Sequence, residues 1–362
     1  MATGLPNAYK HFKSAQSPLR FREDGTFHIL HLTDIHEVHP DMDDDENRQV
    51  PIDKSVETLN VIEECLERTK PDLVVFGGDN ISGHWREFTY DYMAHSIRKI
   101  IAPIVKRNIP LTVVFGNHDS ECANLLPFLH RENQINIYAE YPNFRGTLND
   151  EDVFGCGNCN IPILAHDSDA VNWNVWCIDS NDYLRNDDYT LQENPSGYDY
   201  VHDDQIEWYE RKAAELKEQN GGKPVPSLLF QHIPVLQEYE FCDEVVKGTE
   251  GAIEKDGKYF LPRSDAFSQG VMREGPCPTP ENGKQFESWV KTGDVVAAFF
   301  GHDHTNTFVG ELEGIKLIQT IGAGYHSYGI ERGGRLIVLH ENSRDFDTQT
   351  LTVDRITDTI FD

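Results

Sequence analysis

The stretch FHILHLTDIH at residues 27–36 decides the fold, because an apolar run of strand type ends directly in Asp34 and His36. Short apolar runs of this kind are typical of buried strands. In open α/β sheets, polar groups that bind ligands gather beyond the carboxyl ends of the strands. The same pattern recurs in LVVFGGDN (73–80), LTVVFGNHD (111–119), SLLFQHIP (227–234) and VVAAFFGHDH (295–304). These five strand ends therefore predict one common site.

Amphipathic stretches separate the first three runs, so the order from 27 to 115 is strand, helix, strand, helix, strand. This order predicts right-handed crossovers and a parallel sheet. After about residue 290, short glycine-containing connections favour antiparallel pairing and a mixed sheet. We expect an α/β protein in which two sheets pack together with helices outside. The further strands are predicted at 173–179, 315–320 and 335–340, and the helices at 53–69, 90–107 and 204–219.

The domain is expected to span residues 27–345, after an N-terminal extension at 1–26 and before a C-terminal segment at 346–362. The segment at about 233–294 is rich in Pro, Gly and charge, so we interpret it as an insertion lying over the site. The acidic run at 41–46 is interpreted as a solvated loop.

The composition is that of a globular protein with a strongly acidic balance. The chain of 362 residues has 32 Lys and Arg against 61 Asp and Glu, a formal net charge of −29. This charge argues against partners such as nucleic acid or an anionic membrane surface. No run of about 18 apolar residues and no apolar signal segment is present, so we expect a cytoplasmic protein, although a mature secreted chain would look the same.

Seven scattered cysteines do not form the pattern of a disulfide framework. Cys156 and Cys159 form one C-x-x-C pair, and a structural zinc site would need a second pair. We therefore interpret this pair as part of a loop that is inert or open to incidental oxidation.

The residue types at the five strand ends are those of a metal site. Residues two apart at a strand end project to the same side, so Asp34 with His36, and His302 with His304, can each present two donors together. Seven donors exceed what one catalytic zinc-like ion takes from a protein. If one carboxylate bridges, they suit two ions roughly 3.5–4 Å apart. The seven are Asp34, His36, Asp79, Asn117, His232, His302 and His304.

The ordered blocks DIH, GDN, GNHD, H and GHDH resemble the calcineurin-like metallophosphoesterase superfamily. Within it, LTDIH, GGDNISG, IDSNDY and GHDHTN are similar to the purple acid phosphatase-like branch, which includes plant type 29 enzymes and fungal Dcr2-like phosphatases. The superfamily resemblance implies a four-layer αββα sandwich of two mixed sheets flanked by helices, with a dinuclear site at the sheet edges.

The resemblance also implies a role for each donor. The first metal would take Asp34, His36, Asp79 and His304, and the second Asp79, Asn117, His232 and His302, with Asp79 bridging. His118 matches the catalytic histidine that contacts phosphate or acts as an acid, and Asp119 would orient it. True purple enzymes carry glycine where His36 stands and a tyrosine ligand where this chain has Ser82. The iron–tyrosinate chromophore is therefore not expected.

Four further residues are weaker candidates for substrate binding. His84 and Arg86 follow the GDN block, and Arg86 could clamp a phosphate. Tyr325 and His326 lie in the glycine-rich GAGYHSYG. Exposed loop residues and a plain glycine turn are the alternative interpretations for these two pairs.

We therefore interpret the chain as a phosphoesterase that uses two divalent ions (Mn, Fe, Zn or Co) and a metal-bound hydroxide, with phosphomonoesters favoured. Its partner would be a small phosphorylated substrate. The alternatives are a phosphodiesterase or nucleotidase at the same site, or a metal-binding scaffold without catalysis.

Overall fold

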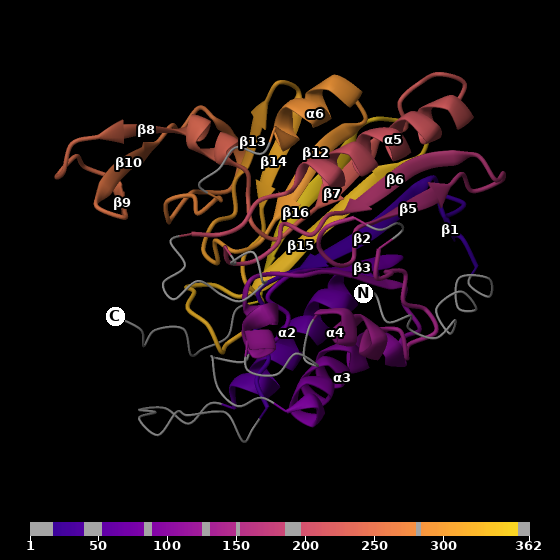
Figure 1. The fold of residues 1–362 in the computed structure, drawn as a ribbon, viewed down its shortest axis with the longest axis horizontal. Helices are drawn as coiled ribbons and strands as arrows, with labels where there is room; N and C mark the ends of the chain where they lie inside the picture. Colours follow the sequence, from indigo (N-terminus) through magenta and orange to yellow (C-terminus); the bar gives the residue numbers. More distant parts are fainter. Residues whose placement is uncertain are drawn as a thin grey trace.

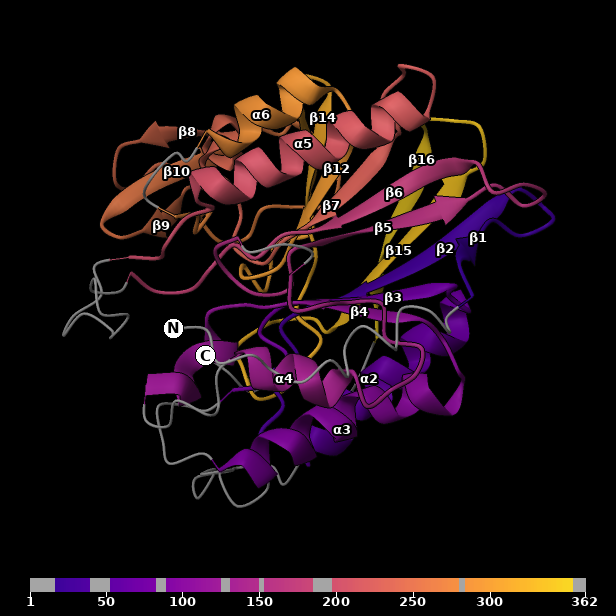
Figure 2. The same ribbon diagram turned by 45° about the vertical axis from the view of Figure 1, so that its right-hand side comes forward.

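The computed structural model describes residues 17–39, 53–82, 89–124, 131–149, 153–184, 197–279 and 284–353. These residues form four layers, with helices, two β-sheets and a second set of helices stacked in that order (Figure 1; Figure 2). The αββα sandwich predicted from the sequence is confirmed.

The five-stranded sheet contains the first three predicted strands, which are parallel to one another. The crossovers between them are helices α2 (Lys54–Thr69) and α3 (Tyr90–Lys106), as the strand–helix alternation predicts. The sheet order is β16 (Phe346–Thr352), β15 (Gly333–His340), β2 (Thr26–Leu32), β3 (Leu73–Gly77) and β4 (Leu111–Val114). Because β16 pairs with β15 along its whole length, the sheet extends past residue 345, where the sequence placed the end of the domain.

The second sheet has eight strands and a parallel centre. Its four central strands are parallel neighbours, namely β6 (Val171–Cys177), β7 (Ser227–Phe230), β12 (Val295–Phe300) and β14 (Ile315–Gln319). Antiparallel strands complete most of the rest. The sheet also takes in β1, which lies in the predicted N-terminal extension and pairs with β5. The order is β1 (Leu19–Arg20), β5 (Cys159–Leu164), β6 (Val171–Cys177), β7 (Ser227–Phe230), β12 (Val295–Phe300), β14 (Ile315–Gln319), β13 (Val309–Leu312) and β11 (Phe267–Gln269).

Alternation along the strands builds three separate cores. Successive strand side chains point to opposite faces, so Leu228 and Phe230 pack between the two sheets, whereas Leu229 packs against the outer helices. In the other sheet, Ile29 faces the second sheet and Leu30 faces the helices. Both faces of each sheet are thus buried, which explains why the strands read as continuous apolar runs.

Helices cover the outer face of each sheet. On the five-stranded sheet lie α2, α3 and α4 (Arg131–Tyr138), and on the eight-stranded sheet lie α5 (Asp203–Gln219) and α6 (Gln285–Thr292) (Figure 2). The face of α2 that packs on the sheet includes Ile62, Cys65 and Leu66, whereas Val56 near the start of the helix is 47% exposed. Among the described helices, none is long and apolar enough to span a membrane.

The predicted insertion at 233–294 divides into three parts. Its middle forms a small separate sheet of β8 (Cys242–Val245), β10 (Lys258–Pro262) and β9 (Ile253–Lys255), which projects from one end of the molecule (Figure 1). This sheet follows the short helix η4 (Leu236–Phe241). However, β11 and α6 belong to the main layers, and Trp289 of α6 is buried in the outer core.

Candidate metal centre

The carboxyl ends of five strands from both sheets meet at one point, and the seven predicted donors lie there. Asp34, His36, Asp79 and Asn117 follow β2, β3 and β4 of the five-stranded sheet, whereas His232, His302 and His304 follow β7 and β12 of the eight-stranded sheet. Each of the seven is at most 8% exposed. The convergence predicted from the strand ends is therefore present in the structure.

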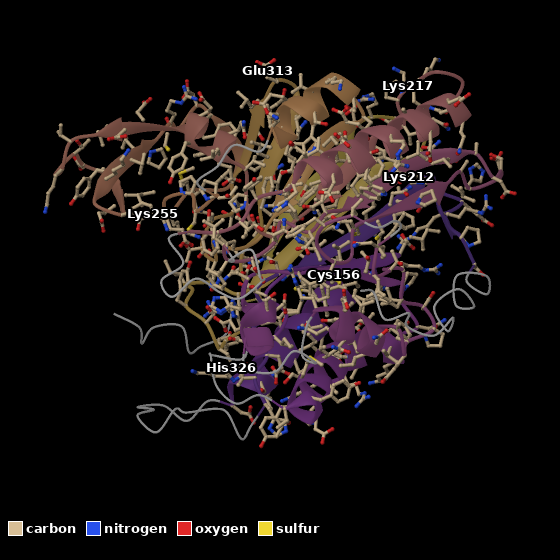
Figure 3. All side chains as sticks on the ribbon, viewed as in Figure 1. Cys156, Lys212, Lys217, Lys255, Glu313 and His326 are labelled. Carbon is tan, nitrogen blue, oxygen red and sulfur yellow. The ribbon has the colours of Figure 1, made fainter. Side chains whose placement is uncertain are left out.

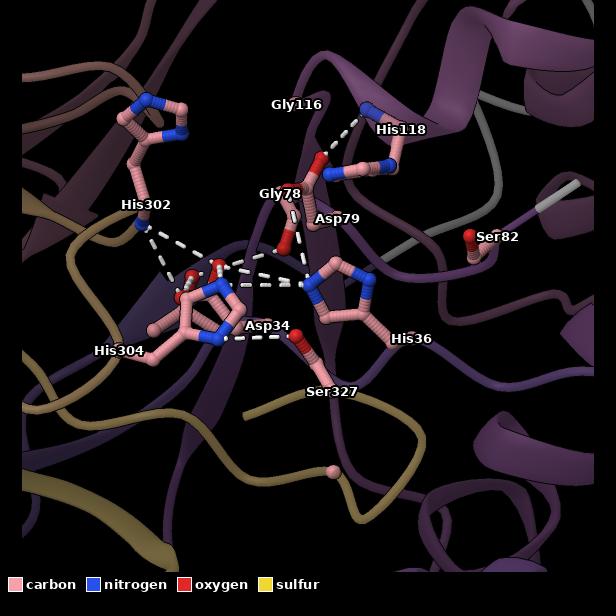
Figure 4. Close-up of polar contacts among 12 residues, drawn as sticks. Asp34, His36, Gly78, Asp79, Ser82, Gly116, His118, His302, His304 and Ser327 are labelled. Atoms are coloured by element: carbon pink, nitrogen blue, oxygen red, sulfur yellow. Dashed lines mark hydrogen bonds and ion pairs between the residues drawn. The ribbon is translucent and has the colours of Figure 1, made fainter. Parts of the chain in front are cut away.

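One group of donors contains Asp34, His36, Asp79 and His304, whose ligand atoms all lie within 4.8 Å of one another. Nε2 of His304 is 3.2 Å from Oδ1 of Asp34, and Nε2 of His36 is 3.7 Å from Oδ2 of Asp79 (Figure 4). The Nε2 atoms of the two histidines are 3.4 Å apart. Four donors that face a common centre at this spacing can hold one cation.

A second group shares Asp79 with the first. The ligand atoms of Asp79, His232 and His302 also lie within 4.8 Å of one another. Oδ2 of Asp79 is 3.0 Å from Nε2 of His232, so the same oxygen faces donors of both groups. The arrangement is that of a site for two ions with a shared carboxylate.

The hydrogen bonding of the second group indicates that a cation fits it. Oδ1 of Asn117 and Nε2 of His302 are buried and have no hydrogen-bond partner among the described residues, whereas Oδ2 of Asp79 and Nε2 of His232 face each other at 3.0 Å. A buried polar atom left unpaired costs about 1–3 kcal/mol. The opposite atoms are engaged: Nδ1 of His232 donates to the Gly77 carbonyl at 2.9 Å, and Nδ2 of Asn117 donates to the Tyr183 hydroxyl at 2.8 Å. The unpaired lone pairs are thus held toward a common centre, as metal ligands require.

The backbone at the site is strained in a way that supports a ligand role. Asp34, His36, Asp79 and His302 have φ values of 51°, 47°, 50° and 72°, in the left-handed region. A residue other than glycine costs about 1–3 kcal/mol there, and such residues cluster at functional sites. Hydrogen bonds between the loops maintain the conformation, for example from the His36 amide to the Asp79 carbonyl at 2.8 Å.

Gly116 of the GNHD block is required by close approach rather than by its conformation. A Cβ atom at this position would lie 2.2 Å from Oδ1 of Asp79 and 2.6 Å from Cδ2 of His232. Gly116 is not among the residues with positive φ. The glycine therefore lets the connection that follows β4 pass directly against two donors.

His118 lies beside the two groups and is held at both its backbone and its ring. Its amide donates to Oδ1 of Asp79 at 2.8 Å (Figure 4), and Nδ1 lies 2.6 Å from Oε1 of Glu121. Burial disfavours the charged ring, but the Asp79 and Glu121 carboxylates outweigh it and raise the pKa of His118 to about 9. The side chain is 34% exposed, so it can reach a molecule bound from solvent.

Asp119 does not orient His118, which corrects the role that the resemblance implied. Its carboxylate accepts hydrogen bonds from the backbone amides of Asn80, Ile81 and Gly116 at 2.9 to 3.1 Å. Asp119 therefore joins the loops after β3 and β4. Glu121 contacts the His118 ring instead, because the two residues lie one turn apart in the 3-10 helix η2 (His118–Asn124). The His-x-x-Glu spacing is the signal in the sequence that indicates this contact.

The structure gives the candidates for substrate binding different places. Tyr325 is 6% exposed and packs in the core beside α2, where its amide donates to the hydroxyl of Thr58. Figure 3 shows His326 on the same side of the molecule as α2. From the same loop, the Ser327 hydroxyl contacts Nδ1 of His304 at 3.0 Å. His84 and Arg86 lie outside the described residues.

The C-x-x-C pair does not contribute to a metal site within the described residues. Cys156 and Cys159 are both 2% exposed, and no cysteine belongs to the groups that could hold an ion. One further group, His166, Asp167 and Glu341, lies at the surface, where the His166 ring pairs with Glu341 at 2.8 Å.

Comparisons with known proteins agree with this geometry. The family model of the calcineurin-like phosphoesterases matches residues 27–306. Probable inactive purple acid phosphatase 29 of Arabidopsis thaliana is 30% identical over 90% of this chain and 80% of its own length. Phosphatase DCR2 of Saccharomyces cerevisiae is 25% identical over 80% of this chain but only 46% of its own. The crystal structure of a dimetal phosphatase from Danio rerio is similar in fold, with a TM-score of 0.50 and 14% identity over 90% of this chain and 98% of that chain.

Proposed function

Because the chain belongs to the calcineurin-like phosphoesterase family, we propose that it is an active phosphatase that hydrolyses phosphate monoesters with two divalent metal ions. One observation carries the proposal. The donor set is complete, buried and arranged around a shared carboxylate, and Oδ1 of Asn117 and Nε2 of His302 have no hydrogen-bond partner among the described residues.

Each group of donors would hold one of the two ions. Asp34, His36, Asp79 and His304 would hold one ion, and Asp79, Asn117, His232 and His302 the other. Such ions, when bound, neutralise charge on the phosphoryl oxygens and lower the pKa of a water molecule. Imidazole and carboxylate donors together suit Mn, Fe, Zn or Co.

The remaining chemistry falls to His118. Its protonated ring is placed beside the donors and can give a proton to the leaving oxygen as the bond to phosphorus breaks. The Glu121 carboxylate 2.6 Å from Nδ1 favours the protonated form that this step needs. Asp119 keeps the loops that carry Asp79 and His118 in register.

The net charge of −29 favours a small phosphorylated substrate over a polyanion. A nucleic acid or an anionic membrane would be repelled at long range. We therefore propose low-molecular-weight phosphomonoesters, or phosphorylated residues presented singly, as the substrate class.

The alternative is a metal-binding protein without catalysis. Three plant relatives carry the words "probable inactive" in their names, and this makes inactivity the outcome to be tested. The complete donor set and the contact between His118 and Glu121 favour catalysis, since a scaffold has no need of a supported acid beside its ions.

A substrate panel decides between these outcomes. The purified protein would be stripped with a chelator, reloaded with Mn, Fe, Zn, Co or Mg, and assayed on phosphomonoesters, phosphodiesters and nucleotides. We expect hydrolysis of monoesters that needs added metal. Two bound ions without turnover of any substrate would support the scaffold, and faster turnover of diesters would overturn the monoester assignment.

A further inference from the structure

The proposed function uses His118 but leaves unexplained the buried carboxylate that contacts its ring. Glu121 is 1% exposed, and its Oε1 lies 2.6 Å from Nδ1 of His118. We infer that Glu121 is a positioning residue that orients His118 for proton transfer, and that Ser82 supports it from behind. This inference rests on the proposed phosphatase function.

Local geometry fixes the pair. His118 and Glu121 both lie in η2, and side chains three residues apart eclipse one another in a 3-10 helix. The start of this helix is anchored, because the His118 amide donates to Oδ1 of Asp79. The imidazole is therefore fixed by one carboxylate at its backbone and by another at its ring.

Glu121 is itself held on its other oxygen. The Ser82 hydroxyl donates to Oε2 of Glu121 at 3.4 Å, and Ser82 is 0% exposed. Ser82 occupies the position at which purple enzymes carry their tyrosine ligand. In this chain the residue at that position supports a carboxylate in place of binding a metal.

The chemical consequence concerns the orientation of the ring. An acceptor at Nδ1 selects the form in which Nδ1 carries a hydrogen and Nε2 faces away from the acceptor. The His118 and His36 rings meet edge to face with centroids 4.9 Å apart, so the His118 ring lies directly beside the donor groups. When the ring carries a hydrogen on both nitrogens, Nε2 can pass its proton to the oxygen of the departing alcohol, and the neutral ring that remains keeps its hydrogen on Nδ1 facing Glu121.

The test is Glu121→Gln, which keeps the shape of the side chain and removes its charge. For an alkyl phosphate, which is a poor leaving group, we expect kcat to fall roughly 10- to 100-fold with KM unchanged, the usual effect of losing such an outer partner. For p-nitrophenyl phosphate, whose leaving group needs little protonation, the loss should be about threefold at most. Two metals should remain bound per chain.

Further variants separate positioning from general damage. In a His118→Ala background, Glu121→Gln should have no further effect, because a residue that acts through another shows no independent contribution. Ser82→Ala should lower kcat less than Glu121→Gln does, and again more for the alkyl phosphate than for p-nitrophenyl phosphate. Glu238→Gln replaces another fully buried Glu, which contacts Gln319, and should leave that dependence unchanged.

Three results would overturn the inference while the proposed function stands. The first is that Glu121→Gln lowers kcat equally for good and poor leaving groups. The second is that it lowers kcat further in the His118→Ala background, and the third is that it loses a bound metal ion. An inactive wild-type protein would instead overturn the proposed function itself.

Discussion

Substituting Gly116 by alanine should disable the metal centre without unfolding the protein. The residue lies in the strand-to-helix connection after β4, and its backbone does not need the freedom of glycine. Only the space around its α-carbon is restricted. An added methyl group therefore probes the packing of the two donors next to it.

The structure sets the size of the effect. The new Cβ would lie 2.2 Å from Oδ1 of Asp79 and 2.6 Å from both the Asp79 amide nitrogen and Cδ2 of His232. Ordinary contact begins near 3.4 Å. One of these groups must therefore move by about 1 Å, and a displacement of that size at a reacting centre can cost about 100-fold in rate. Asp79 faces both donor groups, so we also expect loss of bound metal.

The assay combines metal analysis after dialysis, kcat on an aryl phosphate, and chemical denaturation. Gly314→Ala is the matched control, because Gly314 has a φ of +78° but nothing within 4 Å of an added Cβ. It should cost the fold about 1 kcal/mol and leave metal content and rate unchanged. If Gly116→Ala kept two metals and near wild-type turnover, the close approach would not constrain the site.

Four further outcomes are expected. Asp79→Asn should lower metal content and rate more than loss of any other single donor, and a variant with two metals and full turnover would refute its bridging role. His118→Ala should keep both metals but slow turnover roughly 10²–10⁴-fold, mostly for poor leaving groups; equal losses for all leaving groups would contradict an acid role. Burial, followed by the charge of Arg335, lowers the pKa of His31 to about 3. As the pH falls below about 6.5, His31 is therefore protonated in the unfolded chain but stays neutral in the folded one, and the folded state loses stability. Between pH 7 and 4.5, denaturant titrations should show that the free energy of unfolding falls by roughly 3 kcal/mol more for the wild type than for His31→Gln. Equal decreases for the two proteins would refute this. Finally, an absorption spectrum of the iron-loaded, oxidised protein should show no strong tyrosinate band, because Ser82 supplies no phenolate and burial raises the pKa of Tyr183; a purple preparation would show that the donor set is incomplete.

The sequence predicted those strands that are buried on both faces. Such strands read as continuous apolar runs, as in VVAAFF of β12. It missed strands that lie at an edge or carry polar residues, such as β16, where FDTQTLT buries only Leu351. Pairing with β15 stabilises that strand, and pairing partners far along the chain cannot be read from a local pattern.

The same distinction applies to the site. The seven donors could be predicted because each directly follows an apolar run, so its position depends on local sequence alone. Asp119 was misassigned because its true partners, the amides of Asn80 and Ile81, come from another strand end. Glu121 was missed because the His-x-x-Glu spacing brings the two side chains together only where the chain forms a 3-10 turn, as it does in η2.

Each donor group draws side chains from both sheets, and this has a thermodynamic consequence. His304 on one sheet faces Asp34 on the other, and His232 likewise faces Asp79. An ion bound by either group would link two layers between which the described residues form an apolar core. Metal binding then stabilises the fold. Each ion would add about 2.7 kcal/mol to the free energy of unfolding at a free metal concentration 100 times its Kd. Reciprocally, a change in the packing of Phe230 or Ile29 between the sheets would alter how tightly the distant ions are held.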